Sequence, residues 1–231
     1  LGDVYKRQEE YMRISKYIDY IDDPEDTFLQ YINKGKFYDF RCVFADLETY
    51  AVAVEYLKDT SVIIAGAIDF PEGKLSLDEK MKMFKTYAEK GFREIDYVLN
   101  QKAVEQKDYL YIEKEMSCIA DFCRTHGILD KAIVEMCKLD NDEAAKREIC
   151  RIANKAKPAF LKTSTGKSYA GAKLEDVKLM KSILHDDIKI KAAGGIHNYQ
   201  EAMAFIKAGA SVLGASAGIA IVKGETQNVI E

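Results

Sequence analysis

The 231-residue sequence has few of the residues that mark flexible joints, disulfide frameworks or metal centres. It contains 3 prolines and no serine-rich or low-complexity tract, so no linker is visible and we expect a single domain. Its 5 cysteines are odd in number and scattered, without a C-x-x-C pair, which argues against a disulfide framework and a zinc knuckle. The 3 histidines match no ligand spacing, which disfavours a metal-dependent mechanism.

Charge and hydropathy argue against two classes of partner. The net charge of −4, with acidic and basic residues interspersed, leaves no basic face for nucleic acid and no polybasic patch for a membrane surface. No apolar run reaches the roughly 18 residues needed to span a bilayer, and we expect no signal peptide. We therefore expect a cytoplasmic protein with small-molecule partners.

The string DVYKRQ (3–8) resembles the translation of a transposon-end adaptor used in sequencing libraries. We therefore expect residues 1–8 to be a non-native, adaptor-derived segment and residues 9–231 to form the domain.

Short apolar and β-rich runs alternate with segments of helical periodicity, such as Leu77, Met81, Phe84 and Ala88. Eight strands each followed by a helix predict an α/β fold, a single-domain (β/α)8 TIM barrel, for which this length is compact but sufficient. An open doubly wound sheet is the alternative. The expected strands are KYIDY (16–20), DFRCVF (39–44), SVIIAGAI (61–68), REIDYVL (93–99), KAIVEMC (131–137), AFLKT (159–163), IKIKAAGG (188–195) and SVLGAS (211–216).

Candidate functional residues with polar side chains occur in five of these strands. In a barrel the functional side chains sit at the C-terminal ends of strands, and side chains alternate between the interior and the helices. An inward Lys191 therefore sends Ile190 outward, and an inward Lys162 does the same for Leu161. The polar residues are Asp19, Asp96, Glu135, Lys162 and Lys191 in the first, fourth, fifth, sixth and seventh strands.

Lys162 and Lys191 lie on neighbouring strands, which are about 4.8 Å apart, so their ammonium groups would repel each other. A lysine with an ordinary pKa of about 10.4 is rarely neutral at pH 7, whereas desolvation and a nearby cation lower the pKa. Schiff-base enzymes activate their nucleophilic amine in this way. The structural alternative is that each lysine pairs with a carboxylate, with Lys191 next to Asp96, and both arrangements can hold together.

Glycine and hydroxyl residues follow the last three strands, at STG (164–166), GG (194–195) and GASAG (214–218). Barrels bind phosphate in the loops after strands seven and eight, where glycine lets backbone N–H groups approach and a helix N-terminus adds positive potential. Turns also need glycine for conformational reasons alone. The pair of loops nevertheless predicts a phosphate subsite.

These motifs resemble the deoxyribose-phosphate aldolase family over about Ile18 to Val222. The most specific is FLKTSTGK (160–167), and EIDYV (94–98), KAAGGIH (191–197), DFPEG (69–73) and IDYI (18–21) match the family's other patterns. The resemblance implies a class I aldolase that reversibly cleaves 2-deoxy-D-ribose 5-phosphate to acetaldehyde and D-glyceraldehyde 3-phosphate. It implies no metal and no organic cofactor, and homo-oligomers are common in the family.

Carried over residue by residue, the resemblance makes Lys162 the Schiff-base lysine and Lys191 the second lysine, which depresses its pKa. Asp96 becomes the acid/base carboxylate, working through water. The residues that the resemblance implies for binding substrate and its phosphate are Asp19, Cys42, Thr165, Gly166, Lys167, Gly194, Gly195, Gly214 and Ser216.

The sequence departs from the family pattern at several places. Tyr20 and Ile21 replace a His and a Thr, Asp69 replaces a Gly, and His197 replaces an Arg near the phosphate, while SVLGASAG (211–218) lacks the usual Arg and one Ser. Two other functions stay open: a related Schiff-base aldolase acting on another aldehyde or an unphosphorylated sugar, and a non-catalytic phosphate-binding barrel.

Lys189 shares its strand parity with Lys191. It is expected either to point into the barrel and pair with Glu94, or to sit at an exposed strand start.

Overall fold

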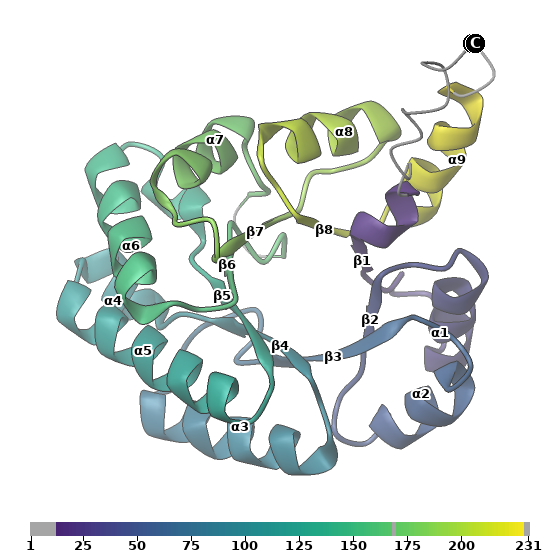
Figure 1. Ribbon diagram of the computed structural model, residues 1–231, viewed down its shortest axis with the longest axis horizontal. Helices are drawn as coiled ribbons and strands as arrows, with labels where there is room; N and C mark the ends of the chain where they lie inside the picture. Colours follow the sequence, from purple (N-terminus) through teal and green to yellow (C-terminus); the bar gives the residue numbers. More distant parts are fainter. Residues whose placement is uncertain (1–12, 168–169, 229–231) are drawn as a thin grey trace, which may run out of the picture.

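The computed structural model describes residues 13–167 and 170–228, so the expected adaptor segment, 1–8, lies outside the described residues. Eight parallel strands close into one barrel in sequence order, with β1 bonded to both β2 and β8, and helices surround it (Figure 1). The closed barrel confirms the predicted TIM barrel over the open sheet. The strands are β1 (Ile18–Tyr20), β2 (Cys42–Phe44), β3 (Ile63–Ile68), β4 (Glu94–Val98), β5 (Leu129–Ile133), β6 (Phe160–Lys162), β7 (Lys189–Ala193) and β8 (Val212–Ala215).

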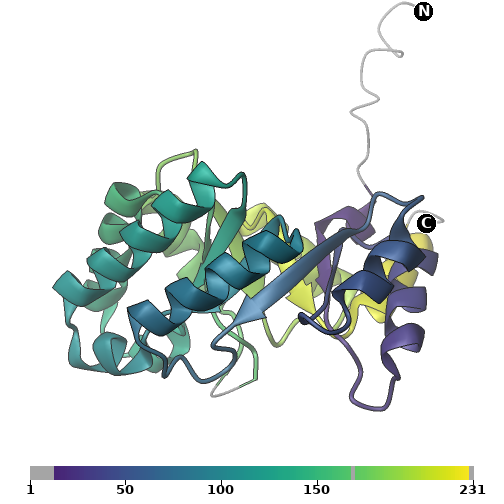
Figure 2. The same cartoon turned by 90° about the horizontal axis from the view of Figure 1, so that it is seen from below.

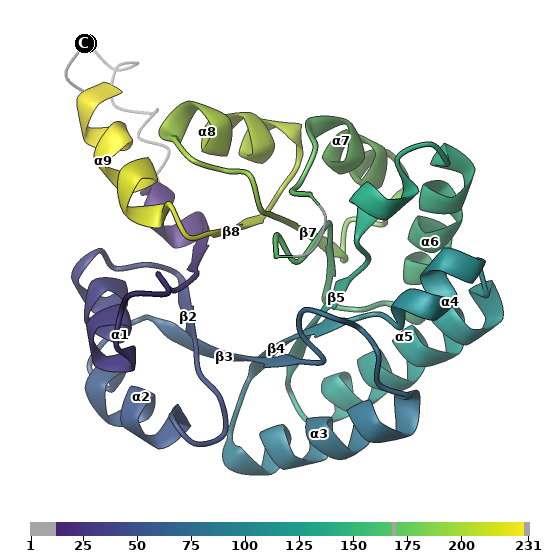
Figure 3. The same ribbon diagram turned by 180° about the vertical axis from the view of Figure 1, so that it is seen from behind.

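The helices form the outer ring, which is seen from the opposite side in Figure 3. Two of them, α4 and α5, lie between β4 and β5, where one helix was expected. The α-helices are α1 (Phe28–Phe37), α2 (Tyr50–Leu57), α3 (Leu77–Lys90), α4 (Gln101–Gln106), α5 (Tyr109–Thr125), α6 (Glu143–Ala156), α7 (Leu174–Ile183), α8 (Tyr199–Ala208) and α9 (Gly218–Asn228), with 3-10 helices η1 (Ile14–Tyr17) and η2 (Met136–Leu139). None of the helices that the structure describes is long and apolar enough to cross a membrane.

Local sequence signals explain where the helices begin and end. Helix α3 starts at a capping box in which the Ser76 side chain accepts from the Glu79 backbone N–H and the Glu79 side chain accepts from that of Ser76. It ends at Gly91, whose φ of 112° suits a residue without a Cβ. Helix α9 lies beside η1 and completes the ring (Figure 1), and Figure 2 shows the same ribbon turned by 90°. The Ile14 N–H donates to Glu225 Oε1 at 2.8 Å and links the two helices.

The barrel interior is unusually polar. The outward side chains of Leu161 and Ile190 pack in the apolar core under the helices, as strand alternation predicts. The register places Lys162 beside Lys191, and Asp96 beside Lys131. Inward positions of neighbouring strands therefore bring charged groups, rather than branched aliphatic ones, to one level of the barrel.

The expected strand position of Glu135 was wrong, and the structure decides between the two expectations for Lys189. Glu135 lies beyond β5, at a φ of 64°, and precedes η2. This turn aims its carboxylate at the Thr165 N–H, which donates to it. Lys189 is exposed at the start of β7, with Nζ 5.6 Å from the centre of the Phe160 ring, while Glu94 pairs with other cations. Lys189 thus follows the second of its two expectations, the exposed strand start.

Asp130 is a buried carboxylate that lies outside the polar interior of the barrel. Asp130 occupies the second position of β5 and is 2% exposed. Its Oδ1 accepts from the Ala159 N–H at 2.9 Å, and its Oδ2 has no hydrogen-bond partner among the described residues. Burial raises the pKa of Asp130 to about 6. Ionisation of Asp130 at neutral pH therefore destabilises the folded protein.

We expect Asp130→Asn to stabilise the protein at pH 7 and to flatten its stability profile in weak acid. The folded-state pKa is raised from 3.8 to about 6, so the folded protein binds more protons than the unfolded chain between these values, and stability falls as pH rises through them. Asparagine keeps the oxygen that accepts from Ala159, and the gain at pH 7 should be about 2–3 kcal/mol. Urea unfolding at several pH values measures it, with the exposed Asp187→Asn as the control. Equal pH slopes in the Asp130 variant and the wild type would contradict the prediction.

Candidate active site

The C-terminal ends of the strands open into a cavity of about 330 Å³. Phe44, Phe70 and Ile196 contribute apolar walls, and the loops after β6, β7 and β8 contribute polar ones. The cavity brings together most of the predicted site residues, namely Asp96, Lys162, Thr165, Gly166, Lys167, Gly194, Gly195, Gly214 and Ser216. Lys191, Asp19 and Cys42 are not part of its lining among the described residues.

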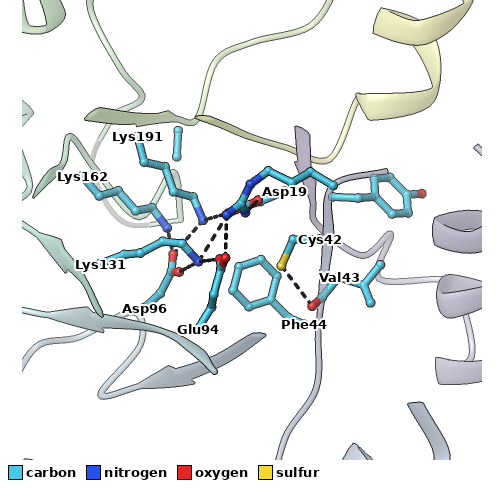
Figure 4. A network of polar contacts seen from close by, with 12 residues as sticks. Asp19, Cys42, Val43, Phe44, Glu94, Asp96, Lys131, Lys162 and Lys191 are labelled. Atoms are coloured by element: carbon cyan, nitrogen blue, oxygen red, sulfur yellow. Dashed lines mark hydrogen bonds and ion pairs between the residues drawn. The ribbon is translucent and has the colours of Figure 1, made fainter. Parts of the chain in front are cut away.

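The two predicted lysines share one carboxylate oxygen. Lys162 Nζ and Lys191 Nζ each donate to Asp96 Oδ2 at 2.8 Å, as Figure 4 shows. Lys191 also donates to Asp19 Oδ2 at 2.6 Å. The expected pairing of Lys191 with Asp96 is therefore confirmed. Lys162 lines the cavity, and its Nζ lies 5.5 Å from the centre of the Phe70 ring, whereas Lys191 is buried behind it.

A third lysine and an arginine, which the sequence analysis did not single out, complete this layer. Lys131 Nζ lies 2.6 Å from Glu94 Oε2 and 3.1 Å from Asp96 Oδ1. Arg41 bridges Asp19 at 2.5 Å and Glu94 at 2.6 Å. Strand parity could have revealed Lys131, because it is two residues from Ile133, the register partner of Lys162.

Charge balance in this layer singles out Lys162. Three carboxylates, Asp19, Glu94 and Asp96, face the cations Arg41, Lys131 and Lys191, and Lys162 is the fourth cation. Burial, with the repulsion of Lys191 and Lys131, lowers the pKa of Lys162 to about 8, and the attraction of Asp96 opposes this only in part. Lys162 is thus the member of the layer that loses its proton most readily near neutral pH.

Two carboxylates of the charged layer, Asp96 and Asp19, stay ionised. Burial alone would raise the pKa of Asp96, but Lys131, Lys162 and Lys191 hold it well below its usual range. Burial likewise opposes ionisation of Asp19, yet Lys191, Lys131 and Arg41 lower its pKa to about 2. Asp96 and Asp19 are therefore not expected to be neutral at neutral pH.

Asp19 and Cys42 lie below the cavity, so the structure does not bring them to a position for contacting substrate. Asp19 is the middle residue of β1, opposite Cys42 in the register, and both are fully buried. Burial raises the pKa of the Cys42 thiol well above its usual range, which makes it a poor nucleophile. The ligand atoms of Asp19, Cys42 and Glu94 lie within 4.8 Å of one another, but Arg41, Lys131 and Lys191 already neutralise the two carboxylates.

The glycines of the polar wall have a packing role of their own. Gly166 and Gly194 have φ values of 71° and 85°, and a Cβ on Gly166 would lie 2.8 Å from the Gly194 Cα. The loops after β6 and β7 therefore meet backbone to backbone, and the Ser164 hydroxyl ties them by donating to the Ala193 carbonyl at 2.6 Å. A Cβ on Gly214 would lie 2.9 Å from the Ala193 Cβ, so this glycine lets β8 lie close to the end of β7.

Two departures from the family pattern have a local explanation. Asp69 has a φ of 56°, a conformation natural for glycine, and its two carboxylate oxygens accept from the Lys74 and Leu75 N–H groups at 2.9 Å. Tyr20 is buried and stacks on Phe40 with ring centres 4.5 Å apart. His197 lines the cavity and is exposed, and its backbone N–H donates to Glu201.

This geometry defines a class of protein: TIM-barrel enzymes with a desolvated lysine at a strand end. No family model matches the chain. It is 38% identical over 218 residues to the deoxyribose-phosphate aldolase of Streptococcus sanguinis, covering 93% of this chain and 97% of the relative. It is 41% identical over 189 residues to that of Lactobacillus acidophilus, covering 82% and 79%. The solved structure of QR15, an aldolase, matches with a TM-score of 0.83 at 29% identity, covering 95% of this chain and 98% of that one. The chain belongs to the deoxyribose-phosphate aldolase family.

We expect Lys191→Leu to raise the pKa of Lys162 by about one unit or more, because a buried cation is lost while Asp96 and Asp19 stay. The pH dependence of Schiff-base formation should shift upward by the same amount. Rates of acetaldehyde adduct formation between pH 6 and 10 measure the shift. Lys189→Leu, which removes an exposed lysine from the same strand, is the matched control. An unchanged profile in the Lys191 variant would show that Lys191 does not tune Lys162.

Proposed function

We propose that Lys162 is the nucleophile with which this chain reversibly cleaves 2-deoxy-D-ribose 5-phosphate to acetaldehyde and D-glyceraldehyde 3-phosphate. One observation carries the assignment of the role: Lys162 is the lysine of the charged layer that lines the cavity, and its pKa is lowered to about 8. A neutral amine in an apolar-walled cavity is the group that attacks an aldehyde carbon.

The reaction proceeds through covalent intermediates on Lys162. The Lys162 amine adds to carbon 1 of the open-chain sugar, and loss of water gives an iminium ion. A base removes the proton of the carbon-3 hydroxyl, the bond between carbons 2 and 3 breaks, and its electron pair moves toward the iminium nitrogen. Glyceraldehyde 3-phosphate leaves, and the remaining enamine is protonated at carbon 2. Water then hydrolyses the acetaldehyde iminium and restores the amine.

Asp96 is suited to the proton transfers. Its carboxylate lines the cavity and stays ionised beside three lysines, so it can accept a proton through a water molecule and return it. Lys191 would hold Asp96 in position through the shared Oδ2 and lower the pKa of Lys162. This division of roles explains why the two lysines differ in access to the cavity.

The outer end of the cavity is suited to the substrate phosphate. Lys167 supplies a cation, and Gly194, Gly195 and Gly214 supply backbone that an oxyanion can approach. The N-terminus of α9, two residues after Ser216, adds its dipole. A non-catalytic phosphate-binding barrel would need these loops but not a desolvated amine.

The expected homo-oligomer and cytoplasmic location stay predictions.

Reduction with borohydride in the presence of acetaldehyde should add an ethyl group to Lys162, because the reductant traps the iminium as a stable amine. Peptide mass mapping locates the label, and Lys162→Met should abolish it. Labelling at Lys191 alone would reverse the two roles, and no labelling would remove the Schiff-base mechanism. A coupled assay that reads aldehyde release from 2-deoxyribose 5-phosphate then tests the substrate.

We expect His197→Arg to lower the Michaelis constant for 2-deoxyribose 5-phosphate by roughly tenfold and to leave that for 2-deoxyribose nearly unchanged. Arginine adds a permanent charge and a planar pair of donors for two phosphate oxygens, and such a contact contributes about 1.5–3 kcal/mol. Steady-state kinetics on the two sugars measure the effect, with the exposed His185→Arg as the control. Equal changes for both sugars would show that His197 does not face the phosphate.

A further inference from the structure

We propose that Asp22 is a specificity-determining residue that weakens the binding of phosphorylated sugars and favours their neutral counterparts. The inference rests on the proposed aldolase function, because it concerns the outer end of the same cavity. Open-chain sugars with a free hydroxyl in place of the phosphate are the substrate class that this chain accepts better than the family pattern suggests.

The register of the first and last strands places Asp22 at the phosphate end of the cavity. Tyr20 pairs with Ala215, and the Ile21 N–H donates to the Ala215 carbonyl at 3.1 Å. Asp22 follows Ile21 just beyond β1, Ser216 follows Ala215 at the end of β8, and both line the cavity. The aspartate therefore lies beside the loop that would receive the phosphate.

The Asp22 carboxylate is free to act on a ligand. It is exposed, and within residues 13–167 and 170–228 it has no hydrogen-bond or ion-pair partner. Its acidic neighbours are engaged locally: Asp23 accepts from the Glu25 N–H at 3.2 Å, and Asp26 pairs with Lys34 at 2.6 Å. Neither neighbour is in the cavity lining that the structure describes.

Charge at this end of the cavity is balanced rather than positive. Lys162 and Asp96 belong to the charged layer below, which leaves Lys167 and Asp22 as the oppositely charged side chains near the phosphate loops. A phosphomonoester carries about −1.5 to −2 charge at pH 7, so Asp22 repels it while Lys167 attracts it. A sugar hydroxyl can instead donate a charge-assisted hydrogen bond to the carboxylate. The same residue thus acts in opposite directions on the two classes of substrate.

The test compares kcat/KM for 2-deoxyribose 5-phosphate and for 2-deoxyribose in the wild type, Asp22→Asn and Asp22→Lys. We expect the ratio of the phosphorylated to the unphosphorylated sugar to rise roughly tenfold in the Asn variant and further in the Lys variant, mainly through KM. The effect should shrink at high salt, because exposed charges are screened. Asp23→Asn, which removes the adjacent charge outside the cavity, should leave the ratio within about twofold of the wild type.

Two results would overturn the inference: an unchanged ratio in both Asp22 variants, or an equal rise in the Asp23 variant. Borohydride trapping with acetaldehyde, which has no phosphate, separates this failure from that of the proposed function. Labelling of Lys162 with an unchanged ratio removes only the role of Asp22. Absence of labelling in the wild type removes the Schiff-base function and, with it, this inference.

Discussion

The barrel interior depends on the Asp96 carboxylate, which binds three buried lysines at once. Each of Lys131, Lys162 and Lys191 lies within 3.1 Å of one of its oxygens. A buried lysine without a partner would deprotonate or destabilise the fold, and a buried aspartate without cations would take up a proton. The shared carboxylate lets all of these groups occupy a space that most proteins fill with aliphatic side chains.

The balance of charge in this layer links stability to chemistry. With Arg41, Lys131 and Lys191 neutralising three carboxylates, a proton on Lys162 leaves a net charge in the buried interior of the barrel. This cost lowers the pKa of Lys162 and so raises the fraction of neutral amine, the form that an aldolase nucleophile needs. We therefore expect the charge balance of the interior to be what makes Lys162 reactive.

The outer end of the cavity follows different rules, because its groups are exposed and screened by water. There the cavity is lined by the backbone of glycine loops, one lysine, one histidine and one aspartate. His197, one of these groups, departs from the family pattern, while Lys162, Lys191 and Asp96 match it. We expect variation at the rim to change selectivity without disturbing the buried charges of the layer below.

The sequence by itself determined the barrel, the positions of its strands and the level of Lys162, Lys191 and Asp96 within it, because strand alternation and strand-end polarity are local patterns. It did not predict that β5 ends before Glu135, whose backbone is left-handed, and it left two alternatives open for Lys189. Only the tertiary structure showed that Lys131 and Arg41 join the buried layer, and that Asp19 and Cys42 lie beneath the cavity rather than in it. Those facts depend on register and on which charge meets which across the barrel, and such contacts between distant strands leave no spacing signal along the chain.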